Sequence, residues 1–273
     1  MQKLERESKM FLGSTSEYTG CILLHHVYFC NFYHFLLQLV PVLFCIMNSS
    51  VLRKRRILVN KSLKELNYSR KVLEYLADAR GLDVIFIDSE VIRVKDPILV
   101  NIDQLINYTT REQLESIRKV GFSVFANIDS CKIFPRSPDG RKYLVIDRQP
   151  YAGGFSPYLK MKIENDFPYA LIIRPHEYEL KDQIEFFQDA DVILAPHGGA
   201  LALMVFSTKA KIIEVSSCCW YNDCFRLISS INNLRHVSIS NGALMPKILS
   251  YRSTIGYKKD LYALITKEVR HNA

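Results

Sequence analysis

The chain has 273 residues, of which 48% are hydrophobic and 23% charged, the balance of a globular protein with a substantial core. Its net charge of +8 suits an anionic ligand or an acidic surface. No Lys/Arg tract alternates with aromatic residues as in a nucleic-acid groove, so we expect no nucleic-acid partner. Seven cysteines without a CxxC pair indicate neither a disulfide framework nor a zinc site, and favour reduced thiols in the cytoplasm.

The amino-terminal third offers two interpretations. Residues 1–16 are charged and polar and lack the apolar core of a signal peptide. Residues 21–47 are apolar enough for a membrane span, but six residues interrupt them at a density that is costly in hydrocarbon. These residues are His25, His26, Asn31, His34, Gln38 and Pro41. We expect a buried strand at 21–29, a turn at 30–31 and a helix at 33–47, with a membrane span as the alternative.

Apolar runs alternate with helix-like stretches along the rest of the chain. Before a linker rich in proline, serine and glycine at 131–142, the pattern predicts strands at 57–60, 83–87, 91–94 and 98–100, and helices at 69–80 and 110–119. After the linker it predicts strands at 143–146, 169–173, 192–195, 211–215 and 235–240. The helices expected between them are 158–164, 180–188, 201–206, 221–231 and 260–270.

This alternation on both sides of the linker predicts the fold class. We expect an α/β protein with two Rossmann-like, doubly wound parallel-sheet domains that face a cleft. The domains are expected at residues 1–136 and 141–273.

The most informative motif is His197-Gly198-Gly199, which follows the strand expected at 192–195. Ligands bind at the carboxyl ends of strands in open α/β sheets, and N–H groups at a helix start attract phosphate. The motif is therefore interpreted as a diphosphate cradle, with a plain strand-to-helix turn as the alternative. An esterase oxyanion loop would need a G-x-S-x-G motif, which the sequence lacks.

Other polar residues follow expected strands. Arg148 and Arg174 each end a strand, where a guanidinium can neutralise a phosphate leaving group or simply face solvent. His34 begins a helix after an apolar strand, and either takes a proton from a hydroxyl or caps the helix. Asp189-Ala190-Asp191 precedes a strand instead of ending one, so we expect it to close a helix and bind no metal.

Taken together, these segments resemble glycosyltransferase family 61 from about residue 30 to residue 240. The amino-terminal signature N-x-x-H-[WF]-L-x-[DE]-x-x-P-R is matched by Asn31, His34, Phe35, Leu36 and Pro41. A strand ending in arginine, followed by a Pro-x-[DE] and glutamine stretch, is matched by 143–148, Pro175, Glu177 and Gln183. The signature G-P-H-G-A-G-L-x-N-x-x-F…V-I-E-[IL] is matched by Pro196, His197, Gly198, Leu201, Phe206, Ile213 and Glu214.

The resemblance implies a GT-B-type fold and an inverting glycosyltransferase that is a hexosyl- or pentosyltransferase. The domain at 141–273 would hold a nucleotide-diphosphate sugar, most simply UDP-linked, and the domain at 1–136 a hydroxyl of a glycan or lipid-linked glycan. Catalytic candidates are His34 as general base and Asn31. Donor-binding candidates are Arg148, Arg174, His197, Gly198, Gly199, Ala200 and Glu214, the last for the ribose. Basic side chains can replace a metal, so we expect no cofactor and no metal.

The resemblance and the charge also suggest where the protein acts. We expect a cytoplasmic enzyme of cell-surface polysaccharide synthesis, with room for peripheral contact at the inner face of the membrane. Two departures from the signatures motivate a second hypothesis, a catalytically silent nucleotide-sugar-binding or scaffold protein. Gln38 stands where the signature has an acid, and Leu203 where it has an asparagine.

Overall fold

The computed structural model describes residues 17–24, 29–87, 93–100, 109–125, 134–148, 153–216, 223–240, 255 and 258–271. By compactness the chain divides into two units. The first comprises Met1–Cys30 and Val42–Ile102, and the second Asn31–Pro41 and Asp103–Ala273. The short segment that carries His34 therefore belongs to the same compact unit as the carboxyl-terminal half. The division at 1–136 and 141–273 stays a prediction.

The first unit contains a four-stranded parallel sheet in the order β4-β3-β2-β6. Its strands are β2 (Ile22–Leu24), β3 (Ile57–Asn60), β4 (Val84–Ile87) and β6 (Ile98–Leu99). Two further strands, β1 (Glu17–Thr19) and β5 (Arg93–Lys95), form a separate parallel pair. The sequence did not predict β1, because three polar or small residues give no apolar run. Residues 25–28 of the strand expected at 21–29 lie outside the described residues.

The helices of this unit are η2 (Leu52–Lys54), α4 (Ser62–Glu65), α5 (Asn67–Arg80) and most of α3 (Val40–Asn48). Two of them, α5 and α3, lie where the sequence predicts them, whereas η2 and α4 were not predicted. Helix α5 ends because Gly81 adopts φ 66° and donates its N–H to the carbonyl of Ala77. This is the left-handed cap that glycine adopts without steric cost.

Residues 32–48 form one helical stretch, as expected from the sequence. It consists of α2 (Phe32–His34), the π-helical turn η1 (Phe35–Leu39) and α3. Asn31 begins it, because its side chain accepts a hydrogen bond from the N–H of Tyr33 at 3.0 Å. In the part of the chain that the structure describes, no helix has both the length and the apolarity to cross a membrane.

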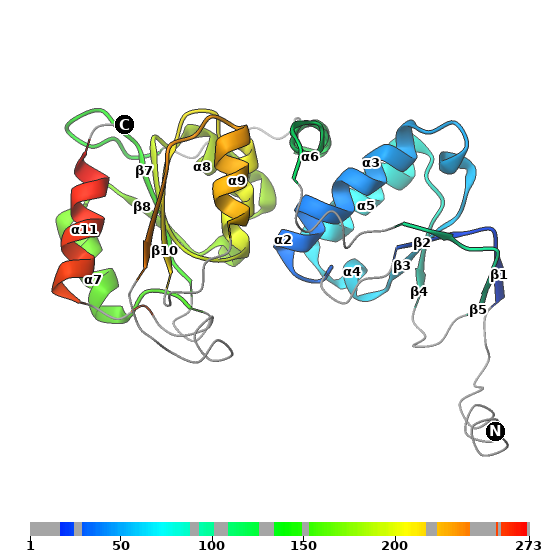
Figure 1. Ribbon diagram of the computed structural model, residues 1–273, viewed down its shortest axis with the longest axis horizontal. Coiled ribbons are helices and arrows are strands. Elements are labelled where there is room, and N and C mark those ends of the chain that lie inside the picture. Colours follow the sequence, from blue (N-terminus) through cyan, green and yellow to red (C-terminus); the bar gives the residue numbers. More distant parts are fainter. Residues whose placement is uncertain are drawn as a thin grey trace, which may run out of the picture. The chain divides into compact units, whose positions relative to one another are not determined.

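The second unit contains a five-stranded parallel sheet in the order β11-β10-β9-β7-β8 (Figure 1). Its strands are β7 (Tyr143–Ile146), β8 (Leu171–Ile173), β9 (Val192–Pro196), β10 (Lys211–Ser216) and β11 (His236–Ser240). The chain adds β8 on one side of β7 and then β9, β10 and β11 on the other. The direction of winding therefore switches between β7 and β9, where ligands bind in open α/β sheets.

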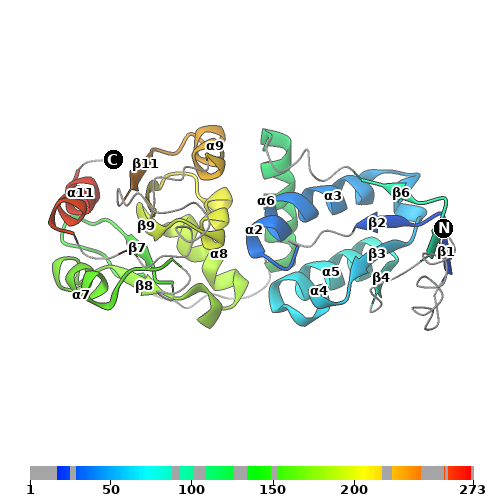
Figure 2. The same cartoon turned by 60° about the horizontal axis from the view of Figure 1, so that its bottom comes forward.

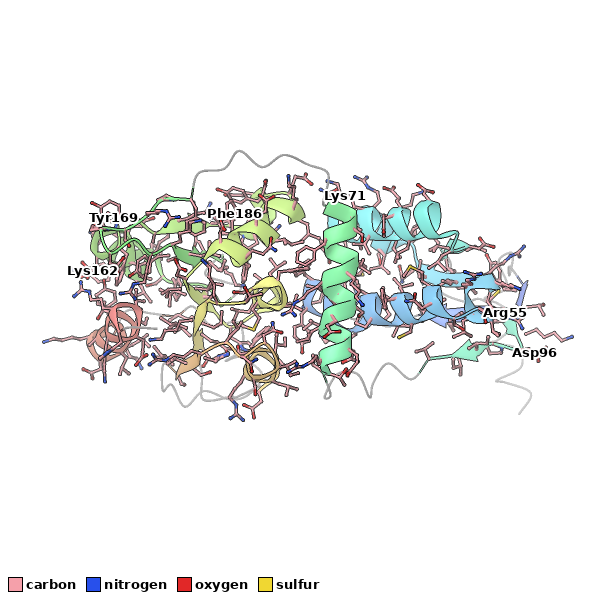
Figure 3. All side chains as sticks on the ribbon, turned by 90° about the horizontal axis from the view of Figure 1, so that it is seen from above. Arg55, Lys71, Asp96, Lys162, Tyr169 and Phe186 are labelled. Atoms are coloured by element: carbon pink, nitrogen blue, oxygen red, sulfur yellow. The ribbon has the colours of Figure 1, made fainter. Side chains whose placement is uncertain are left out.

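Helices cover both faces of this sheet (Figures 1 and 2). On one face lie α7 (Pro157–Asp166) and α11 (Lys259–Arg270), and on the other α8 (Leu180–Asp189), η6 (Gly199–Phe206) and α9 (Cys224–Ile231). Strands buried on both faces read as continuous apolar runs, as β7 and β9 do. In Figure 3, Lys162 of α7 and Phe186 of α8 mark these two helical layers.

Two further elements complete the unit, α6 (Arg111–Phe125) and the short helix η5 (Pro175–Glu177). Thr110 caps α6: its hydroxyl accepts the N–H of Gln113, and the side-chain oxygen of Gln113 accepts the N–H of Thr110. Arg118 of α6 donates to the carbonyl of Val205 and to Asn232, both at 2.7 Å. This arginine therefore ties the end of η6 to the end of α9.

The fold class is confirmed as mixed α/β with parallel sheets of Rossmann-like character. The arrangement of two domains around a cleft stays a prediction. One element differs in type: the helix expected at 201–206 is a 3-10 helix that begins at Gly199.

One buried ion pair yields a stability prediction. Lys211 of β10 is fully buried and donates to the carbonyl of Glu268 at 2.6 Å and to its carboxylate at 2.8 Å. Glu268→Ala leaves that ammonium underpaired, so we expect a loss of about 3 kcal/mol in unfolding free energy. Lys211→Met leaves only a part-exposed carboxylate, so we expect a loss of about 1 kcal/mol. Urea unfolding measures both losses, with the exposed Lys267→Met as control. A larger loss for Lys211→Met than for Glu268→Ala would contradict this prediction.

Candidate functional site

The candidate site lies at the switch point of the five-stranded sheet. Strand β7 ends at Ile146 and is followed by Arg148, while β9 ends at Pro196 and is followed by His197. The guanidinium of Arg148 donates a hydrogen bond from Nη1 to the carbonyl oxygen of His197. The structure thus brings together the arginine and the glycine turn that the sequence singled out separately.

Gly198 allows this approach. A Cβ atom at Gly198 would lie 1.9 Å from Nη1 and 2.5 Å from Cζ of Arg148. The backbone there also has φ 158° and ψ 175°, a combination essentially confined to glycine. The guanidinium therefore packs directly on the turn, and any side chain at this position would displace it.

Gly199 has a different role. A Cβ atom there would lie 3.4 Å from Oδ1 of Asn31 and 3.6 Å from the backbone nitrogen of Tyr33, which is ordinary contact. The glycine turn thus packs against the first residues of α2, within the same compact unit. Gly199 and Ala200 open helix η6, and the first N–H groups of a helix lack acceptors within it. This is the amino-terminal geometry that attracts anions.

Glu214 lies in the middle of β10 with only 5% of its surface exposed. One carboxylate oxygen pairs with Nδ1 of His197, and the other with Nε2 of His236 at 2.9 Å. Burial alone would raise the pKa of Glu214, but these two hydrogen bonds outweigh it and hold the pKa below its ordinary value. Both oxygens are engaged in this way, so the ribose role expected for Glu214 stays a prediction.

The network extends to residues that the sequence did not single out. Ser229 of α9 lies 2.8 Å from Nδ1 of His236, and Ser238 donates to the carboxylate of Glu214 at 3.5 Å. His236 and Ser238 are two apart in β11, which puts both on one face of the strand. The sequence shows this alternation, but not that the shared face meets Glu214, because that depends on the pairing of β11 with β10.

Aromatic packing joins the His34 segment to α9. The ring of Phe225 meets the rings of Tyr33 and His197 edge-on, with centroids 5.6 and 5.2 Å apart. The hydroxyl of Tyr33 is hydrogen-bonded to the thiol of Cys224. Burial raises the pKa of Tyr33 and raises that of Cys224 to about 12, so both groups stay neutral.

His34, the candidate base, is held by its own helix. Its Nδ1 lies 2.9 Å from Oε1 of Gln38, one helical turn further on. Asn31, the other catalytic candidate, serves as the N-cap of α2, as described above. The structure therefore places this segment next to the glycine turn through Gly199, Tyr33 and Phe225.

Arg174 lies after β8 and is engaged elsewhere. It donates to the carboxylates of Asp147 at 3.0 Å and Glu177 at 3.3 Å, and Lys160 also pairs with Asp147 at 2.8 Å. The buried carboxylate of Asp147, which the sequence did not single out, thus holds two cations beside Arg148.

The acidic motif at 189–191 closes α8 and precedes β9, as expected. Asp189 pairs with Lys142, and Asp191 pairs with Lys209, each at 2.8 Å. These residues lie at the amino ends of the strands, away from the glycine turn. Among the described residues, no group of three or more His, Cys, Asp and Glu side chains is arranged to hold a metal ion.

The parallel sheet and its switch point define the chain as an α/β protein with a Rossmann-like fold. The family model for glycosyltransferase 61 matches residues 32–213, more than half of the chain. The protein therefore belongs to the glycosyltransferase 61 family, as the sequence motifs predicted. No curated protein matches the chain.

The two glycines give a matched test of the turn. Gly198→Ala drives a Cβ into the guanidinium of Arg148 and strains the backbone, so we expect a loss of about 2 kcal/mol in unfolding free energy. Gly199→Ala adds a methyl group in ordinary contact, so we expect a change below about 0.5 kcal/mol. Chemical denaturation of both variants measures the difference, and equal effects would contradict the close packing of Arg148.

Proposed function

We propose that the protein is an inverting glycosyltransferase that moves a hexose or pentose from a nucleotide-diphosphate sugar to a hydroxyl of a glycan or lipid-linked glycan. Membership of glycosyltransferase family 61 supports the general activity. The observation that carries the proposal is the contact of Arg148 with the His197–Gly198 turn at the switch point. It puts a permanent cation beside a helix start, where a diphosphate is stabilised by both.

In this proposal the donor diphosphate lies on the N–H groups of Gly199 and Ala200, next to Arg148. The imidazole of His197, oriented by Glu214, and the guanidinium of Arg174 are the further donor-binding candidates. UDP is the nucleotide we expect first. As the bond to the sugar breaks, negative charge develops on the leaving diphosphate. Preorganised donors at that position are worth roughly 3 kcal/mol each.

In this proposal the segment that begins with Asn31 activates the acceptor hydroxyl. We propose His34 as the general base that takes the proton of the acceptor hydroxyl. The hydroxyl oxygen then attacks the anomeric carbon from the face opposite the diphosphate, which inverts the configuration there. The packing of Gly199 on Asn31 and Tyr33 supports this, because it puts the base's helix beside the donor turn.

We further propose that the reaction needs no metal, because Arg148 and the helix start supply the positive charge. The proposed setting is cytoplasmic synthesis of a cell-surface polysaccharide, with peripheral contact at the inner membrane face. The net charge of +8 is compatible with such a contact.

A second candidate function is a silent nucleotide-sugar-binding or scaffold protein. Two observations favour it: Gln38 supplies a neutral amide where the family signature has an acid, and Leu203 is apolar and fully buried. Such a protein would bind the donor and release no nucleoside diphosphate with any acceptor.

A panel of nucleotide sugars in a thermal-shift assay tests the binding half. A donor at one hundred times its Kd stabilises the folded protein by about 2.7 kcal/mol. We expect Arg148→Ala to abolish this stabilisation and His34→Ala to keep it while losing transfer, measured as released nucleoside diphosphate. Arg226→Ala and His176→Ala, both exposed, serve as controls.

The outcomes separate the two functions. Stabilisation with no release of nucleoside diphosphate by the unmodified protein would favour the silent binding protein. If the donor stabilised Arg148→Ala as much as the unmodified protein, Arg148 would not be a donor-binding residue.

The metal prediction has its own test. Because Arg148 and backbone N–H groups stabilise the leaving diphosphate, we expect EDTA to leave the transfer rate unchanged. The rate is measured before and after chelation, and again after Mg²⁺ or Mn²⁺ is restored. Loss of turnover with EDTA and its recovery with either ion would refute metal independence.

A further inference from the structure

The buried side chain of Gln38 is only half satisfied by its contact with His34. Gln38 is 1% exposed and lies in the π-helical turn η1, whose five residues are all buried. Its Oε1 meets Nδ1 of His34 at 2.9 Å, whereas its Nε2 has no hydrogen-bond partner among the residues that the structure describes. A buried donor without a partner costs about 1–3 kcal/mol. A leucine or methionine would avoid that cost, so stability alone does not explain the glutamine.

The local helix geometry aims this side chain at His34. The N–H of Val40 bonds to the carbonyl of Phe35, the five-residue spacing of a π-turn. Such turns occur frequently at functional sites because they redirect side chains within a helix. The ring of Tyr33 meets the imidazole edge-on, with centroids 5.1 Å apart. His34 is thus held from two sides, by a ring and by an amide.

We propose that Gln38 is a positioning residue that keeps the proton of neutral His34 on Nδ1, so that Nε2 carries the lone pair. This inference rests on the proposed role of His34 as general base. The hydrogen bond made by one imidazole nitrogen decides which nitrogen carries the proton. Here the acceptor at Nδ1 is an amide oxygen.

The amide orientation in the structure, with Oε1 towards His34, suits the proposed reaction. After His34 takes the acceptor's proton on Nε2, both ring nitrogens carry hydrogen. In that state the amide oxygen of Gln38 still accepts a hydrogen bond from Nδ1–H. If the amide were turned round, its N–H₂ group would face Nδ1–H, and two donors cannot bond to each other. In the same step the acceptor oxygen bonds to the anomeric carbon, and the bond to the diphosphate breaks with its electron pair on the leaving oxygen.

The neutral amide of Gln38 also affects how readily His34 takes up a proton. A carboxylate at this position would favour imidazolium and raise the pKa of His34, whereas an amide orients the ring without adding charge. Tyr33 is one titratable neighbour of His34. Burial keeps the pKa of Tyr33 above its ordinary value, so this phenol stays neutral while His34 titrates.

Nitrogen-15 NMR of histidine-labelled protein tests the tautomer directly, with the His34 signal assigned by its loss in His34→Ala. We expect the Nδ1–H form in the unmodified protein and in Gln38→Glu, and loss of that preference in Gln38→Met. Asn48→Met, at an exposed position of the same helical stretch, is the control, because the side chain of Asn48 bonds to the carbonyl of Phe44 in its own helix. An Nε2–H form in the unmodified protein, or an unchanged tautomer in Gln38→Met, would overturn the proposal.

A second measurement, on Gln38→Glu, tests the proposal even if Gln38→Met does not fold. In Gln38→Glu we expect the pKa of His34, followed by the same signals, to rise by about one unit or more. An unchanged pKa would overturn the proposal as firmly as the wrong tautomer.

The kinetic arm separates this inference from the proposed function. Gln38→Met should lower kcat at least tenfold with KM unchanged, and Gln38→Glu should restore part of it. A drop in KM and kcat together would indicate a merely structural role. If the unmodified protein transfers no sugar but His34 has the Nδ1–H form, the proposed function fails and the positioning by Gln38 stands.

Discussion

The site depends on one steric constraint, the close packing of the Arg148 guanidinium on the backbone of Gly198. A parallel sheet brings the ends of β7 and β9 to one edge, but only a residue without Cβ lets the arginine lie flat on the turn. The carbonyl of His197 completes the contact. A guanidinium held in this way loses little further freedom on binding an anion, which is the benefit of preorganisation.

A second interaction, between Glu214 and His197, stabilises the same turn. Glu214 holds His197 through one oxygen and His236 through the other, so a buried carboxylate is paired on both sides. Removing either histidine would leave a charge buried with half its partners, which is costly in a low-dielectric interior. The acidic residue of the family signature thus acts here on the histidine of the same signature, seventeen residues earlier in the chain.

The segment Asn31–Pro41 connects these features to the proposed chemistry. It is distant in sequence but belongs to the compact unit that holds the glycine turn. Tyr33 reaches Phe225 and Cys224 of α9, while Gly199 packs on its first residue. The proposed base and the glycine turn therefore belong to one compact unit. Of the segment's polar groups, Gln38 is buried and pairs with the half-buried His34.

Most elements could be predicted from the sequence, because strands buried on both faces are continuous apolar runs and helices repeat every three to four residues. The family and the glycine turn were also readable from local motifs. The pairing of Glu214 with His236, the contact of Arg148 with Gly198 and the unit that contains His34 were not. These depend on strand order and on side-chain packing between segments far apart in the chain, which no local pattern encodes.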